Sequence, residues 1–140
     1  MALATFLHLL RPTPLPDQHA QRLYRARAQQ FASRVRAVFD DWVAAREVEA
    51  DNSRLANTAA VNRWELMRLV REVESLEPPR SLAGVHREVL NAVVGAARAC
   101  QLLANGYRSH KSEAVCDGQA LLVDTVNEID DLVGQLQMRF

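Results

Sequence analysis

The sequence is poor in the residues from which most recognisable active sites are built. It contains five glycines, five prolines, two cysteines and four histidines among 140 residues. No P-loop, dinucleotide-binding glycine motif, nucleophile elbow or His-Glu-x-x-His motif occurs. A Glu-x-x-His motif is also absent, which argues against a di-iron carboxylate bundle. We therefore expect a protein that is not an enzyme and that holds no cofactor and no metal ion.

The chain also lacks an excess of charge of either sign and a long hydrophobic run. Seventeen basic residues balance seventeen acidic residues, so no overall field attracts nucleic acid, and we expect no nucleic-acid partner. No stretch is apolar over the length that crosses a bilayer, so we expect no transmembrane segment. Residues 2–10 are apolar, but they are few and no basic residue precedes them, so they fail as a signal peptide as written. The sequence is compatible with two compartments. We expect an extracytoplasmic location at the cell envelope if a leader lies upstream of Met1, and a cytoplasmic location otherwise.

Apolar residues recur at helical spacing along most of the chain. Residues 17–48 carry such a stripe at steps of four and three: Tyr24, Ala28, Phe31, Val35, Val38, Trp42 and Ala45. The same steps recur in three further segments, and no segment alternates with period two. We predict an all-α fold, an antiparallel up-down-up-down four-helix bundle, with helices over about 17–48, 54–76, 80–105 and 109–138. Residues 1–16 are predicted to be an N-terminal apolar cap and a Pro-rich spacer.

Three short stretches predict where these helices end. Pro78 and Pro79 lack the backbone N–H and push their predecessors out of the helical region, so the chain turns there. Asp51-Asn52-Ser53 offers turn and capping chemistry, and we expect a loop there, with one kinked helix as the alternative. Asn105-Gly106 is expected to end the third helix.

The two cysteines lie on the segments that are predicted to pair across the last turn. If the chain turns back between Gly106 and Ser109, Cys100 and Cys116 occupy opposing positions. A disulfide between them and two buried free thiols are both compatible with this pattern. With no histidine pair nearby, the cysteines do not predict a zinc site.

Two polar residues occupy positions on the apolar stripes. Asn62 lies on the second stripe, where a buried Asn typically fixes helix register. His86 lies on the third stripe, and we interpret it as a buried histidine bonded to a backbone carbonyl or an acid. Trp64 is expected to flank the second stripe. A ligand pocket near His86 and Trp64 is a third functional hypothesis, behind the two given below, and we expect no small-molecule ligand.

Charge is distributed unevenly between the first and last predicted helices. Five arginines (Arg22, Arg25, Arg27, Arg34 and Arg36) lie between Gln18 and Phe39, where no acid occurs. The last helix carries six acids and no base from Ser112 to Met138: Glu113, Asp117, Asp124, Glu128, Asp130 and Asp131. The predicted topology makes these helices neighbours, so the basic run should face the acidic run. The same arginines predict, as an alternative function, an intracellular binder of an anionic partner.

Four features carry a family resemblance. They are the spacer Arg11-Pro12-Thr13-Pro14-Leu15-Pro16, a predicted helix that ends near Trp42, Trp64-Glu65-Leu66, and Leu76-Glu77-Pro78-Pro79 followed by His86. From Arg11 to about Leu136 the chain resembles a group of small bacterial four-helix proteins that are often secreted or lipid-anchored and have no assigned activity. The resemblance implies a four-helix fold and a location at the cell envelope. Our leading interpretation is a non-enzymatic interaction or structural module that binds a protein partner or pairs with a second copy.

Overall fold

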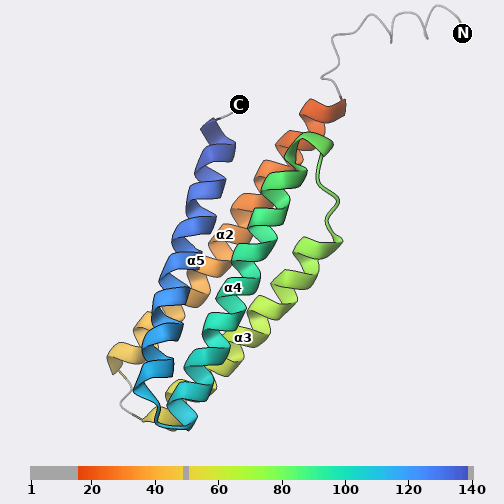
Figure 1. The fold of residues 1–140 in the computed structure, drawn as a ribbon. Coiled ribbons are helices and arrows are strands. Elements are labelled where there is room, and N and C mark those ends of the chain that lie inside the picture. The colour runs from red at the N-terminus through yellow and green to blue at the C-terminus, as the bar shows by residue number, and fades with distance from the viewer. Residues whose placement is uncertain (1–15, 49–50, 139–140) are drawn as a thin grey trace, which may run out of the picture.

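Four long helices make up most of the chain that the structure, a computed structural model, describes, namely residues 16–48 and 51–138. They are α2 (Pro16–Val48), α3 (Asn52–Ser75), α4 (Ala83–Arg108) and α5 (Ser112–Met138), with a short 3-10 turn, η1 (Arg80–Leu82), ahead of α4. No strand occurs in the described residues, and the helices pack side by side as a bundle (Figure 1). The predicted all-α fold is confirmed. The predicted apolar cap and spacer lie outside the described residues, except that Pro16 begins α2.

The breaks between the first three helices lie where the sequence predicts them. Asp51 has an extended backbone, and its carboxylate accepts a hydrogen bond of 2.9 Å from the Ser53 N–H, which caps α3. The alternative of one kinked helix through this region is therefore wrong. Pro78 and Pro79 lie between α3 and η1, where their missing N–H groups cost no helical hydrogen bond.

The end of α4 differs from the prediction. The helix runs past Asn105-Gly106 and ends at Arg108, where a Schellman motif closes it. The Lys111 N–H donates to the Gly106 carbonyl at 2.9 Å, and His110 takes the left-handed position with φ 53°. Gly106 lies inside the helix, and a Cβ there would come within 2.9 Å of the Val115 backbone nitrogen. The glycine is thus needed for close packing, and a histidine supplies the helix stop.

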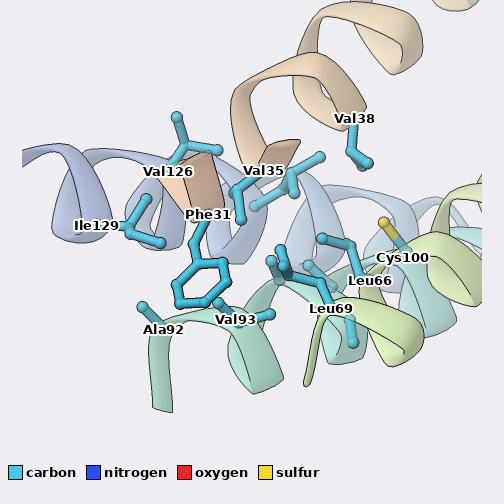
Figure 2. Packing of buried hydrophobic residues seen from close by; sticks show 14 of the residues in the cluster. Phe31, Val35, Val38, Leu66, Leu69, Ala92, Val93, Cys100, Val126 and Ile129 are labelled. Atoms are coloured by element: carbon cyan, nitrogen blue, oxygen red, sulfur yellow. The ribbon is translucent and has the colours of Figure 1, made fainter. Parts of the chain in front are cut away.

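A single apolar core runs along the bundle and receives side chains from all four helices (Figure 2). Its labelled members in the figure are Phe31, Val35 and Val38 of α2, Leu66 and Leu69 of α3, Ala92, Val93 and Cys100 of α4, and Val126 and Ile129 of α5. Each belongs to, or lies beside, a stripe that the sequence predicts. Burial of these stripes away from water is the main favourable contribution to folding.

The helices do not pack equally closely. α4 lies tightly against both α3 and α5, whereas α2 packs more loosely on α3 and α5. Small residues explain the tight contact: a Cβ at Gly118 of α5 would lie 3.0 Å from the Ala99 carbonyl oxygen of α4. α2 meets the core through large side chains, among them Tyr24, Phe31 and Trp42. Clefts therefore lie along the two edges of α2.

Candidate functional site

The outer side of α3 carries a patch of exposed large apolar side chains. Val61, Trp64 and Met67 are 63%, 69% and 37% exposed. At 100° per residue, Trp64 lies on the side of α3 opposite Leu66, which faces the core. The prediction that Trp64 flanks the buried stripe is therefore wrong, and the sequence analysis missed this surface. Arithmetic on the helix period would have found it.

Arginines surround this patch. Arg63, Arg68 and Arg71 line a shallow depression of about 230 Å³ together with Trp64 and Met67. We define the α3 surface as Val61, Arg63, Trp64, Met67, Arg68 and Arg71. Arg68 lies 3.4 Å from Glu65 in an exposed pair, which contributes little and leaves the guanidinium accessible. The surface thus combines a large aromatic ring with accessible positive charge.

The five arginines of α2 do not share one face. Arg34 forms an ion pair with Glu72 of α3, and Arg36 forms one with Asp130 of α5. These partners flank α2 on its two sides, so the arginines that bind them point apart. Arg27 lies over the ring of Phe31, with its guanidinium carbon 5.5 Å from the ring centre. The Arg36–Asp130 pair agrees with the predicted contact between the basic and acidic runs.

The two cysteines are free thiols. Cys100 is 1% exposed among the core side chains (Figure 2), whereas Cys116 is exposed on α5. The candidate disulfide is therefore absent, because one residue faces the core and the other faces solvent. The alternative of two buried thiols is correct only for Cys100. Burial raises the pKa of the Cys100 thiol to about 12.

His86 is a satisfied core histidine at the junction of three helices. The Tyr24 hydroxyl oxygen lies 3.0 Å from its Nδ1 in a hydrogen bond, and the ring also bonds the Val73 backbone carbonyl. Because a carbonyl needs a ring N–H, the neutral tautomer that serves both partners leaves Nδ1 to accept from Tyr24. The two rings meet edge to face, with centroids 5.5 Å apart. Burial lowers the pKa of His86 below its ordinary value, an effect that the Val73 carbonyl partly opposes. Burial also raises the pKa of Tyr24 to about 12. These contacts make His86 structural, as interpreted from the sequence.

Asn62 is buried, as predicted, but its amide is not fully bonded. The side chain is 4% exposed, and its amide nitrogen has no hydrogen-bond partner in the described part of the chain. It lines a cleft of about 210 Å³ between α2 and α3. An unbonded buried donor is costly, and the indole nitrogen of Trp42 is a second core donor without a partner among the described residues. The sequence indicated a buried polar residue but not its unused donor.

The remaining features limit the chemistry of the site. Residues 16–48 and 51–138 contain no group of three side chains suited to hold a metal ion. None of the described helices has the length and apolar character that a bilayer span requires. His86 and Trp64 do not form the pocket of the third hypothesis, because His86 is buried and Trp64 lies on the outer side of α3. The α3 surface, with an exposed tryptophan among three arginines, is the candidate functional site.

Comparisons with protein-family models, curated proteins and solved structures gave no match to this chain. The resemblance to small bacterial four-helix proteins therefore stays a prediction.

Proposed function

We propose that this chain is a non-enzymatic interaction module, an antiparallel up-down-up-down four-helix bundle that binds an acidic amphipathic helix of a protein partner. The observation that carries the proposal is Trp64, whose large ring is 69% exposed among three arginines of the same helix. Val61 and Met67, one turn away on either side of Trp64, are exposed too, and contiguous exposed apolar side chains mark interaction sites where single ones do not.

Contacts between distant segments support the antiparallel arrangement. Ser81, just before α4, bonds Asp17 in the first turn of α2 at 3.3 Å, which brings those two helix starts together. Asn52 at the start of α3 bonds His110 after α4 at 2.9 Å. Short links between successive helices favour neighbours in sequence as neighbours in space.

The composition of the α3 surface favours a protein partner. Trp and Arg are the residues most enriched among those that dominate binding energy at protein interfaces. Trp64 and Met67 offer flat apolar contact to the apolar stripe of an incoming helix. The partner would cover the patch and remove it from water, which is favourable in proportion to the apolar area buried.

The charge of the α3 surface favours an acidic partner. Arg63, Arg68 and Arg71 lie on both sides of Trp64, so a helix with Asp or Glu beside its apolar stripe would place carboxylates near guanidinium groups. Arg pairs with carboxylates in a forked geometry that adds specificity. Complementary charge also speeds association and rejects basic partners.

A panel of designed amphipathic helices tests this proposal. Three peptides share one apolar stripe and carry Glu, Lys or Gln on the polar positions, and binding is measured by isothermal titration calorimetry. We expect the Glu peptide to bind most tightly, with W64A weakening it more than tenfold, as at interface hot spots. Equal affinity for the three peptides, or binding that survives W64A, would contradict the proposal.

Charge-matched variants locate the site. R63Q/R71Q should weaken the Glu peptide about fivefold, since each exposed pair contributes under about 1 kcal/mol. R22Q/R27Q removes the same charge from exposed positions on α2 and should leave binding unchanged. A loss confined to R22Q/R27Q would favour the alternative anionic-partner function of α2 instead.

A second copy of the chain is the other partner that the surface charge favours. α5 exposes Glu113, Asp117, Asp124, Glu128 and Asp131 and carries no base, so its outer side matches the proposed partner in charge, while its apolar stripe is buried in the core. Sedimentation velocity across a concentration series separates the cases. Self-association that R63Q/R71Q abolishes would identify the partner as a second copy, and a monomer at all concentrations would exclude a second copy.

A further inference from the structure

The side of the bundle formed by α2 and α5 carries an apolar cleft that lies apart from the α3 surface. The cleft has a volume of about 540 Å³ and is lined by side chains of both helices. Trp42 of α2 is buried at its base, and Phe39 and Val43 lie half-buried beside it. Val123 of α5 is 40% exposed in the same cleft. Apolar side chains that the core leaves partly uncovered therefore meet here.

The rim of this cleft carries more acid than base. Glu47 of α2 and Asp124 of α5 both line it, and in residues 16–48 and 51–138 neither carboxylate pairs with a basic side chain. Arg46 also lines the cleft, and its guanidinium carbon lies 5.4 Å from the centre of the Trp42 ring. Two unpaired carboxylates against one guanidinium favour a basic partner, since complementary charge speeds association and selects the partner.

We propose that this cleft receives the α3 surface of a second copy of the chain, so that Trp64 of one copy enters the cleft of the next. The indole ring contacts Phe39 and Val123, and the arginines beside it meet the carboxylates at the rim. This inference rests on the proposed function of the α3 surface and names the partner of that surface.

The two surfaces match in shape and in polarity. Trp64 projects from α3 with 69% of its surface exposed, and an aromatic side chain buries about 150–250 Å² when it is covered. The cleft lies within the range of about 300–1,000 Å³ that is typical of pockets for small organic molecules, so it has room for an indole ring. Because α5 turns its apolar stripe to the core, the cleft supplies the apolar contact that the outer side of α5 lacks.

The position of the two surfaces determines the kind of assembly. α3 and α5 lie at opposite edges of the bundle, and their described backbones do not come into contact (Figure 1). One copy can therefore offer Trp64 to one neighbour and its cleft to another. A contact between two different surfaces is heterologous, and it joins copies head to tail into rings or open chains.

A mixing experiment with two half-defective variants tests this arrangement. W64A removes the inserted ring, and V123R fills the cleft and repels the arginines of α3. In sedimentation velocity, the unaltered chain should form oligomers that grow beyond a dimer with concentration, and each variant alone should stay monomeric. An equimolar mixture of W64A and V123R should form a dimer, because one intact cleft and one intact Trp64 remain.

A valine of equal exposure provides the control. Val94 of α4 is 39% exposed and lines neither surface, so V94R should self-associate like the unaltered chain. Thermal unfolding of V94R and V123R shows whether both stay folded. E47Q/D124N, at exposed positions, tests the rim without placing bulk in the cleft, and should weaken self-association about fivefold, since each exposed pair contributes under about 1 kcal/mol.

Cys116 reports whether the cleft is occupied. It lines the cleft and is exposed, whereas Cys100 is buried, so a maleimide should label Cys116 first. Labelling should slow severalfold as the protein is concentrated, because the second copy covers the thiol. W64A should label at the same rate at every concentration.

The results that overturn this inference differ from those that overturn the proposed function. A chain that binds the Glu peptide through Trp64 but stays monomeric at every concentration would keep the α3 surface as the interaction site and exclude the second copy. Self-association that W64A abolishes but V123R and E47Q/D124N leave intact would place Trp64 outside the cleft. Oligomers that stop at a dimer would contradict the head-to-tail arrangement.

Discussion

The hydroxyl of Tyr24 lies 3.0 Å from Nδ1 of His86 in the core, and joins α2 to α4 across 62 residues of sequence. The contact makes the stability of the fold depend on the protonation of one imidazole. In the neutral ring Nδ1 accepts from Tyr24. A protonated Nδ1 would be a donor, so the Tyr24 hydroxyl would have to accept instead, and its own proton would lose its acceptor in the core.

We predict that acid destabilises the protein through His86. Burial lowers its folded pKa below the ordinary value of 6.5, so the unfolded chain takes up a proton at higher pH than the folded chain. The stabilisation of the folded state by neutral His86 is therefore complete above about pH 6.5, the ordinary pKa that applies to the unfolded chain. This stabilisation is lost as the pH falls through the lower folded pKa. Urea unfolding from pH 8 to 5 should show this decrease. H86L should remove it, and H19Q, at an exposed position, should retain it.

Replacing Tyr24 tests the same contact without a titration. Y24F leaves Nδ1 of His86 without its donor in a buried site, and should lower the free energy of unfolding by about 1–2 kcal/mol at neutral pH. Urea denaturation measures the change. Unaltered stability of Y24F would mean that the hydrogen bond is not formed in solution.

The close approach of α4 and α5 predicts that replacing glycine with alanine has opposite effects on stability at two positions of α5. At Gly118 a Cβ would lie 2.9 Å from Leu103 Cγ and 3.1 Å from the Leu103 backbone nitrogen, so G118A should destabilise by about 1–3 kcal/mol. At Gly134 of the same helix nothing lies within 4 Å, so G134A should stabilise by about 0.5–1 kcal/mol. Thermal unfolding compares the two, and a stabilising G118A would contradict the packing described.

The left-handed backbone of His110 predicts that glycine and alanine at this position give different stabilities. Its φ of 53° costs glycine no steric energy but is unfavourable for residues with a Cβ. We expect H110G to be about 1 kcal/mol more stable than H110A, since both lose the bond to Asn52 but only alanine keeps the strain. Equal stability of the two variants would show that α4 does not end in a Schellman motif.

Much of the fold could be predicted because helical periodicity is local. The stripe from Tyr24 to Trp42 and the Pro78–Pro79 break both depend on residues within a few turns of each other. The partner of His86 could not be predicted, because Tyr24 is remote in sequence. The end of α4 was predicted too early because Gly106 suits both a helix stop and a tight helix contact, and only the packed structure decides between them.

The candidate site was predicted less well than the fold. The arginines of α2 are close together in sequence, but Arg34 and Arg36 pair with acids on opposite sides of the helix. Their closeness in sequence therefore does not place them on one face of the helix. Cys100 and Cys116 occupy opposing helices, yet one faces the core and the other solvent. In both cases the rotation of side chains about the helix axis, rather than position along it, determines the outcome.

The most direct test of the proposed function is the environment of Trp64 in the complex. In a W42F variant Trp64 is the single tryptophan, and it is exposed in the free protein. On addition of the Glu peptide, the proposal predicts that Trp64 emission moves to shorter wavelength and that iodide no longer quenches it. If calorimetry shows binding while Trp64 emission and quenching stay unchanged, the partner binds elsewhere and the α3 surface is not the interaction site.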